Sequence, residues 1–583
     1  MNRTTRVAAA LALLSLVPGP LTPGSAAARL QRPAVTRLAL EPCGPRGAER
    51  DMLCGRLDVP ENYEEPQGRS ISLNIVVVPA AKDPRGSAAM FELAGGPGIG
   101  VTGGAGFFLG PGRAFRESRD VVLVDQRGTG ASNPLRCPEI EGRSPLDEMY
   151  PSEAVAACRS RLEAQADLTQ YTTNNSARDL DRVRAALGYR AIDLEGISYG
   201  TELARAYMRT FPDRVRSAVL IGPPPADMRT PLPHAANAQR ALDLLFHECQ
   251  SDERCRSAYP DLRGDWTAVL RRVDAGVRQR RFDPMTGAAT DVVITRGPFA
   301  EAFRGLFTTA AARRSMPLII ARAAAGDFSP FVEAIPADAG GFAEGLYLSI
   351  ACAEGTTRID PADVPRFTAG TFAGDYRVRQ QMGACAEWPV APVAPDFHQP
   401  LATSHPVLAV VGEFDASTPP AYAQEVCAGL ERCRLVQIPR MGHGPFDLGD
   451  WTGGDCLDRV ILEFLGRGAA TGLDTSCLPK MMPPPFLPDE SVTLAAAQID
   501  RIVGTYEQGP IRLVIDLLGG RLRARMYKGE EPVGAWFLTP VSSTRLRLDQ
   551  VPGQFAHLEH EGGRVTLRLS SGEVLVRIDG PGS

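Results

Sequence analysis

A G-x-S-x-G pentapeptide at residues 196–200 constrains this chain more than any other sequence feature. The residues before it, 191–195, predict a short strand, and Leu203 and Tyr207 after it recur at helical spacing. A strand that turns directly into a helix needs glycines where backbone segments approach closely, and the turn lifts its central side chain above the edge of the sheet. The stretch therefore predicts a strained turn that exposes Ser198 as a nucleophile.

The pattern of strands and helices around this turn predicts a mostly parallel sheet. Apolar and β-branched runs separated by helical stretches are typical of strands joined by crossover helices. Between residues 223 and 400, apolar residues recur at helical spacing without such alternation, which predicts a helical cap over the sheet. The expected strands span residues 71–78, 90–93, 119–125, 191–195, 215–221, 407–412 and 435–439, and a closing helix spans 455–464.

The two ends of the chain differ from this central pattern. Residues 1–28 combine a short basic region, an apolar run and small residues, as expected for a secretory signal peptide. Residues 481–492 are proline-rich and predict a linker. Residues 493–583 contain short alternating runs at 511–515, 522–526, 544–548, 565–569 and 574–578, which predict a small antiparallel β-barrel or β-sandwich. The core is thus expected in two parts, 29–222 and 401–480, separated by the cap at 223–400.

Twelve cysteines in a chain with a predicted export signal indicate disulfide bonds. The sequence does not fix their connectivity, and pairing of nearest neighbours is the simplest expectation. A zinc site is the competing interpretation, but the chain contains no C-x-x-C pair, so we expect no metal. The expected disulfides are Cys43/Cys54, Cys137/Cys158, Cys249/Cys255, Cys352/Cys385, Cys427/Cys433 and Cys456/Cys477.

The charge balance and the hydropathy limit the possible partners. A net charge of −5 argues against nucleic acid as the main partner. Outside the leader no apolar run reaches the length of a transmembrane helix, so we expect no membrane association once the signal peptide is removed. The sequence therefore predicts a secreted or periplasmic protein.

A nucleophilic serine needs a base to accept its proton and a group to orient that base. A late expected strand runs into Glu413 and Asp415, and the next one ends close to His443. This order of serine, acid and base, with the last two in loops after late strands, predicts a triad of Ser198, Asp415 and His443. Glu413 is the alternative acid. The remaining histidines are His234, His247, His398, His405, His557 and His560.

A glycine-rich loop follows the expected strand at 90–93 and predicts an oxyanion hole. Such a site needs backbone N–H groups that point at the developing negative charge. The amide of Tyr199, directly after the nucleophile, supplies one donor, and Gly95 or Gly96 supplies the other. A phosphate-binding loop is excluded because the lysine and the serine or threonine of that motif are missing.

These motifs together resemble the proline iminopeptidase and tripeptidyl aminopeptidase branch of the α/β-hydrolases. Residues 94–98 are similar to its G-G-P-G loop, residues 124–132 to its D-Q-R-G-x-G-x-S segment, and residues 196–201 to its elbow. The segment from 412 to 443 and the cysteine pairs resemble the secreted tripeptidyl aminopeptidases. The resemblance implies an α/β-hydrolase fold with a mostly parallel sheet, a helical cap and peptidase activity without a cofactor. Many iminopeptidases have histidine where this chain has Ala94, which favours the tripeptidyl group.

The resemblance also implies that carboxylates of the cap bind the free α-ammonium of the substrate. Glu354 follows Cys352 in the cap, and we take it as the candidate anchor, with an exposed or structurally paired glutamate as the alternative. Trp388 is interpreted as a buried cap tryptophan. Asp125 and Arg127 are interpreted as a structural pair that shapes the loop beside the oxyanion hole.

The sequence thus predicts a serine exopeptidase that releases tripeptides or single residues from peptides with a free N-terminus. Two alternatives stay open. A carboxylesterase or lipase would use the same triad, and a binding protein without catalysis could be built on the same fold. The role of the C-terminal β domain is not indicated by its sequence.

Overall fold

The structure is a computed structural model that describes residues 38–45, 51–82, 88–335, 341–549, 554–561, 564–570 and 572–578. The signal peptide expected at 1–28 lies outside these residues. Among the described helices, none is long and apolar enough to cross a membrane.

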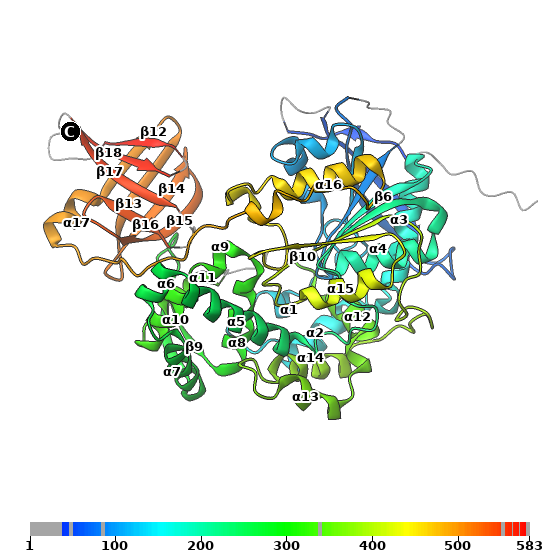
Figure 1. Ribbon diagram of the computed structural model, residues 1–583, viewed down its shortest axis with the longest axis horizontal. Coiled ribbons are helices and arrows are strands. Elements are labelled where there is room, and N and C mark those ends of the chain that lie inside the picture. The colour runs from blue at the N-terminus through cyan, green and yellow to red at the C-terminus, as the bar shows by residue number, and fades with distance from the viewer. Residues whose placement is uncertain are drawn as a thin grey trace, which may run out of the picture. The chain divides into compact units, whose positions relative to one another are not determined.

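A nine-stranded sheet forms the centre of the larger domain (Figure 1). Its strand order is β1-β2-β3-β5-β4-β6-β7-β10-β11, and every neighbouring pair from β5 to β11 is parallel. The first strands pair antiparallel, so the sheet is mostly parallel as predicted. The strands are β1 (Glu41–Pro42), β2 (Leu53–Pro60), β3 (Ser70–Val78), β4 (Ala89–Leu93), β5 (Asp120–Val124), β6 (Ile192–Ile197), β7 (Val215–Ile221), β10 (Val407–Gly412) and β11 (Cys433–Ile438).

Helices cover both faces of this sheet, which explains its continuous apolar strands. Every residue of β5 and β10 is buried, as in parallel sheets enclosed by crossover helices. Helices α3 (Thr173–Leu187) and α4 (Tyr199–Thr210) share one hydrophobic core with β4, β6 and β7. Helix α16 (Cys456–Arg467) shares a second core with β5, β7 and β10 on the other face. The two cores hold the ends of β4 and β6 side by side.

The cap lies between β7 and β10 and is mostly helical, but it also contains a two-stranded hairpin that the sequence pattern did not predict. Strands β8 (Val277–Phe282) and β9 (Ala289–Ile294) pair antiparallel. They carry several charged side chains and are mostly exposed, so apolar alternation gives little signal there. The cap helices are α5 (His234–Ser251), α6 (Glu253–Ala258), α7 (Leu262–Ala275), α8 (Arg296–Gly305), α9 (Ala310–Arg313), α10 (Met316–Ala324), α11 (Ser329–Ala334), α12 (Glu344–Glu354), α13 (Val364–Thr368) and α14 (Tyr376–Glu387).

The C-terminal domain is a closed antiparallel barrel. Of the two architectures that the sequence predicts for this domain, the barrel is therefore the one observed. Consecutive strands pair from β12 to β19, and β12 pairs with β19 to close the barrel. Five of the eight strands correspond to predicted runs; β12, β15 and β17 do not, since glycine, proline or charged residues interrupt their apolar pattern. The elements are α17 (Ala496–Ile502), β12 (Gly504–Gln508), β13 (Ile511–Leu518), β14 (Arg521–Lys528), β15 (Glu531–Pro540), β16 (Arg545–Leu548), β17 (Phe555–Glu561), β18 (Arg564–Leu569) and β19 (Val574–Arg577).

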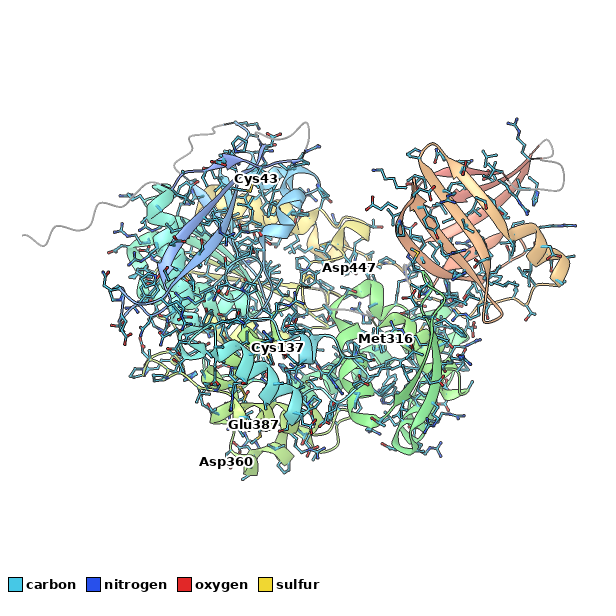
Figure 2. The ribbon with its side chains drawn as sticks, turned by 180° about the vertical axis from the view of Figure 1, so that it is seen from behind. Cys43, Cys137, Met316, Asp360, Glu387 and Asp447 are labelled. Carbon is cyan, nitrogen blue, oxygen red and sulfur yellow. A yellow bond between two sulfur atoms is a disulfide. The ribbon has the colours of Figure 1, made fainter. Side chains whose placement is uncertain are left out.

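Six disulfides join nearest neighbours along the chain, in the pairing expected from the sequence. Cys43 and Cys137, which form two of them with Cys54 and Cys158, are labelled in Figure 2. The other four join Cys249 to Cys255, Cys352 to Cys385, Cys427 to Cys433 and Cys456 to Cys477. Among the described residues no cysteine is left free.

The interpretation of Asp125 and Arg127 as a pair is wrong. The fully buried guanidinium of Arg127 forms two hydrogen bonds of 2.7 Å to Asp179 in α3. Asp125 instead accepts hydrogen bonds from the Thr102 backbone and side chain and from the Ala131 N–H. The two side chains therefore hold different parts of the loop after β5, and the partner of Arg127 lies 52 residues away in the sequence.

We expect the Asp179→Ala variant to lower the free energy of unfolding by about 3–5 kcal/mol, because it leaves the buried Arg127 charge without its counter-ion. Urea-induced unfolding measures this change. The matched control is Glu64→Ala, which breaks the exposed pair of Glu64 with Arg178 and is expected to cost at most about 1 kcal/mol. Equal effects of the two variants would contradict the structural role of Arg127.

Candidate functional site

The G-x-S-x-G turn joins β6 directly to α4, and its backbone is strained at the serine. Ser198 has φ 55° and ψ −120° and precedes the first residue of α4. A Cβ atom at Gly196 would lie 2.5 Å from the Gly200 oxygen, and one at Gly200 would lie 2.1 Å from the Leu93 oxygen. Glycine is therefore required on both sides of Ser198, and the observed strain is typical of a functional residue.

His443 and Asp415 lie in the loops after β11 and β10 and are hydrogen-bonded to each other. His443 Nδ1 lies 2.8 Å from Asp415 Oδ2 and 2.9 Å from Oδ1. Asp415 is fully buried and also accepts hydrogen bonds from the N–H groups of Ser417 and Thr418 and from the Thr418 hydroxyl. These contacts fix the carboxylate, so it can hold the imidazole ring in one orientation.

Glu413 does not take this position. Its Oε2 accepts a hydrogen bond of 2.9 Å from the backbone N–H of Arg440, which lies between the end of β11 and His443. Of the two candidate acids, Asp415 is thus the one that contacts His443.

The glycine-rich loop after β4 lies against the nucleophile turn. A Cβ atom at Gly95 would lie 3.2 Å from Ser198 Cβ and 3.8 Å from Ser198 Oγ. Gly96 has a positive φ of 111°, and the cap covers this loop, since the Ala343 N–H donates to the Gly98 carbonyl. The amide of Tyr199 opens α4 beside the same loop. The backbone groups expected to bind an oxyanion thus lie around Ser198.

Ser198, His443 and Glu354 line one cavity of about 250 Å³ between the sheet and the cap. Gly96 and Tyr199 also line it. In the described structure no hydrogen bond joins Ser198 to His443. The hydrogen bonds of catalytic groups are often long before substrate binds and tighten in the complex. The cavity brings together the predicted nucleophile, base, oxyanion-hole residues and cap carboxylate.

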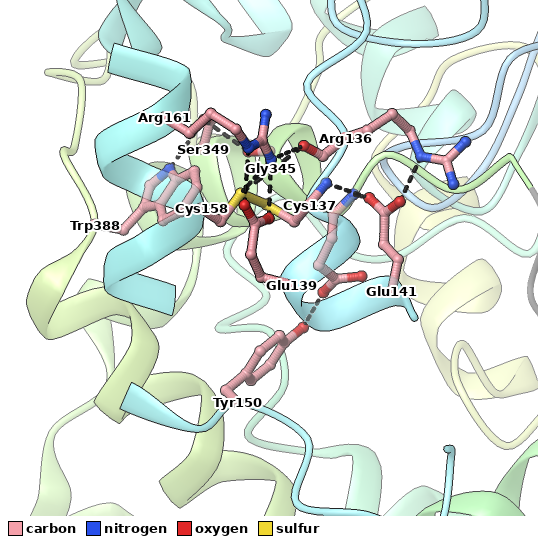
Figure 3. The surroundings of a disulfide bond; sticks show 11 residues. Arg136, Cys137, Glu139, Glu141, Tyr150, Cys158, Arg161, Gly345, Ser349 and Trp388 are labelled. Atoms are coloured by element: carbon pink, nitrogen blue, oxygen red, sulfur yellow. Dashed lines mark hydrogen bonds and ion pairs between the residues drawn. A yellow bond between two sulfur atoms is a disulfide. The ribbon is translucent and has the colours of Figure 1, made fainter. Parts of the chain in front are cut away.

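Helix α12 positions Glu354 at its last residue. Its first turn is held by the Glu344 N–H, which donates to Glu141, and its middle by the Trp388 indole, which donates to Ser349. Figure 3 shows Trp388, Ser349 and Glu141 beside the disulfide of Cys137 and Cys158. The disulfide of Cys352 and Cys385 ties the end of α12 to α14. Trp388 is buried against α12, as interpreted from the sequence.

Glu354 is buried, and both of its oxygens accept hydrogen bonds from Thr173. Oε1 lies 2.8 Å from the Thr173 N–H and Oε2 lies 2.6 Å from its hydroxyl. The pKa of Glu354 is raised to about 8. Burial is the main cause and the neighbouring Glu202 also contributes, while the hydrogen bonds from Thr173 act in the opposite direction. A carboxyl group with such a pKa inside a cavity is a candidate binding group.

The further polar residues of the cavity that were not predicted from the sequence include Glu202, His234, Arg304 and Arg377. Burial, and next the two arginines, hold the pKa of His234 well below its ordinary value, so its ring is neutral. Both arginines pair with Glu301. Of these residues, only Glu202 could have been connected to the site from the sequence. It lies four residues after Ser198 and therefore on the same face of the helix. The other three come from cap helices without a local motif.

Comparison with known proteins gives matches over both halves of this site. The sequence model of the alpha/beta hydrolase fold matches residues 95–246, and that of TAP-like proteins matches residues 370–477. The tripeptidyl aminopeptidase of Streptomyces coelicolor is 26% identical over 477 residues, which are 74% of this chain and 84% of that protein. The first match includes Ser198, and the second includes Asp415 and His443.

Two further relatives match shorter segments. The serine protease Hip1 of Mycobacterium tuberculosis is 33% identical over 224 residues, which are 35% of this chain and 42% of Hip1. The proline iminopeptidase of Neisseria gonorrhoeae is 31% identical over 140 residues, which are 24% of this chain and 34% of that protein. The chain thus matches less than half the length of either of these relatives.

Proposed function

We propose that this chain, which is similar to the tripeptidyl aminopeptidases and proline iminopeptidases of the α/β-hydrolase fold, is a serine exopeptidase acting on peptides with a free N-terminus. The observation that carries this proposal is the single cavity that holds Ser198, His443 and the buried carboxylate of Glu354. A nucleophile and a carboxyl group that ionises when it binds a cation, in one cavity, suit a substrate whose scissile bond lies near a positive charge.

The chemistry follows from the contacts of the three side chains. Ser198 Oγ attacks the scissile carbonyl carbon while His443 Nε2 accepts the hydroxyl proton. Asp415, which is hydrogen-bonded to Nδ1, orients the ring and stabilises its positive charge. His443 then protonates the leaving amine, an acyl-enzyme remains on Ser198, and water attacks it by the reverse sequence. No step requires a cofactor.

The tetrahedral intermediates carry a negative oxygen, for which two backbone donors are proposed. The Tyr199 N–H lies at the start of α4, where the helix dipole also favours negative charge. The second donor is the N–H of Gly96 or Gly95 in the loop that packs against Ser198.

Glu354 is proposed to bind the α-ammonium of the substrate. A buried carboxylate gains a charge-assisted hydrogen bond from an ammonium and gains none from an acylated N-terminus. Release of tripeptides is proposed from the likeness to the tripeptidyl aminopeptidase of Streptomyces coelicolor, which also matches the largest share of the chain among the three relatives described above. Six disulfides favour an oxidising compartment, so we place the mature protein outside the cytoplasm.

The test compares a tripeptide p-nitroanilide with its N-acetylated form. We expect acetylation to lower kcat/KM by about 100-fold, because it removes the cation and with it the charge-assisted hydrogen bond to Glu354. Glu354→Gln is expected to reduce this preference, whereas Glu153→Gln, an exposed site on α2 (Ser152–Glu163), leaves it unchanged. Equal cleavage of the free and blocked peptides would refute the exopeptidase. Rapid turnover of p-nitrophenyl esters without any peptide cleavage would instead identify an esterase.

A further inference from the structure

Glu202 is the second carboxylate of the catalytic cavity, and it lies in the helix that follows the nucleophile. It is located one turn after Ser198 in α4 and lines the same cavity as Ser198 and Glu354. Burial raises the pKa of Glu202, and the nearby Arg205 lowers it. Among the described residues no hydrogen bond or ion pair joins the Arg205 guanidinium to this carboxylate, and Arg205 Nη1 donates to the Pro224 carbonyl.

The two carboxylates differ in what already binds them. Both oxygens of Glu354 accept hydrogen bonds from Thr173, and the Thr173 hydroxyl also lies 2.9 Å from the Tyr199 hydroxyl. Among the residues that the structure describes, none donates a hydrogen bond to the carboxylate of Glu202. A half-buried carboxylate that lacks donors and repels a like charge is stabilised by a cation with several N–H groups.

Resting on the proposed exopeptidase function, we infer that Glu202 is a specificity-determining residue that binds the substrate's α-ammonium together with Glu354. An ammonium has three N–H donors, and one carboxylate already engaged by Thr173 does not satisfy them all. Glu202 supplies the further acceptor from the helix that also carries Ser198, so the bound N-terminus is held relative to the nucleophile by one rigid element.

The pairing of two carboxylates couples substrate binding to a proton. Burial, and to a smaller extent the charge of Glu202, raises the pKa of Glu354 to about 8. The empty cavity therefore holds a proton at neutral pH and releases it when an ammonium binds. Other titratable or charged groups also lie around the cavity or are coupled to Glu202: Tyr199 and Arg205 of α4, His234 of α5, Arg304 of α8, Tyr347 of α12, Arg377 of α14, and His443. Removing the charge of Glu202 lowers the pKa of Glu354, so the acidic limb of kcat/KM moves to lower pH.

The test measures kcat, KM and the pH profile of the full chain with the free and N-acetylated tripeptide p-nitroanilides. Glu202→Gln is expected to raise KM for the free peptide by about 10- to 100-fold with little change in kcat, and to reduce the preference over the blocked peptide by the same factor. The acidic limb is expected to move to lower pH in this variant. The matched control, Glu163→Gln at the exposed end of α2, changes none of these values.

The possible outcomes separate the inference from the proposed function. A wild-type enzyme that prefers the free peptide, with a Glu202→Gln variant that keeps the KM, preference and pH profile, overturns the role of Glu202 alone. A wild-type enzyme that cleaves both peptides equally overturns the exopeptidase and the inference with it. If Glu202→Gln does not fold, Glu202→Asp, which keeps the charge but withdraws it by one methylene, is measured in the same way. A raised KM for the free peptide with an unchanged KM for the blocked peptide supports the inference, and an unchanged KM for both overturns it.

Discussion

The Ser198→Ala variant is expected to lose peptide hydrolysis by a factor of about 10⁵–10⁶ in kcat while it keeps the fold. The substitution removes Oγ, the atom that is proposed to form the acyl-enzyme. It leaves the backbone of the turn intact, because the Ser198 N–H still donates to the Ile221 carbonyl at the end of β7. Alanine adds no atom to the crowded turn. Rates on a tripeptide p-nitroanilide measure the loss.

A fluorophosphonate probe provides a second measurement of the same serine. We expect it to label the wild-type protein and not Ser198→Ala. The matched control is Ser257→Ala, an exposed serine in α6 whose loss should affect neither labelling nor rate. Peptide hydrolysis at the wild-type rate by Ser198→Ala would exclude this serine as the nucleophile. Absence of labelling in folded wild-type protein would favour a binding protein without catalysis.

The Asp415→Asn variant is expected to lower kcat by about 10⁴-fold, with KM nearly unchanged. An amide at this buried position presents an N–H group to His443 Nδ1, so the ring adopts the wrong tautomer and Nε2 no longer accepts the serine proton. The three hydrogen bonds from Ser417 and Thr418 hold the side chain of residue 415 in place. The asparagine therefore cannot turn away to restore the correct tautomer of His443.

Glu413→Gln is the matched control for this prediction, because Glu413 was the alternative acid. Its carboxylate binds the Arg440 N–H and does not contact His443, so we expect a change in kcat of only a few-fold. Steady-state kinetics of the two variants distinguish the acids. A loss near 10⁴-fold in Glu413→Gln, with Asp415→Asn active, would reverse the assignment.

The sequence predicts the parts of this site that depend on local motifs. The G-x-S-x-G turn, the glycine-rich loop and the two late loops each follow a strand of a parallel sheet, and such strands end at one edge. Ser198, Gly96, Asp415 and His443 could therefore be expected at one edge of the sheet before their distances were known. The apolar strands of the sheet were equally predictable, because burial on both faces leaves a continuous signal.

The features that were missed depend on contacts between distant segments. Arg127 pairs with Asp179 in another helix, and nothing near Arg127 in the sequence indicates that partner. Glu202 has an ordinary position within an amphipathic helix, and only the cap above it makes its surroundings a cavity. The hairpin of β8 and β9 and three barrel strands carry charged, glycine or proline residues, so their pairing is decided by their neighbours and not by their own pattern.

The measurement that tests the central claim most directly is digestion of a library of peptides with free N-termini, with the released fragments read by mass spectrometry. We predict that every fragment begins at the N-terminus of its peptide and that most are three residues long. The same library after N-acetylation should stay intact. Fragments from internal or C-terminal positions, or equal digestion of the acetylated library, would contradict the proposed exopeptidase.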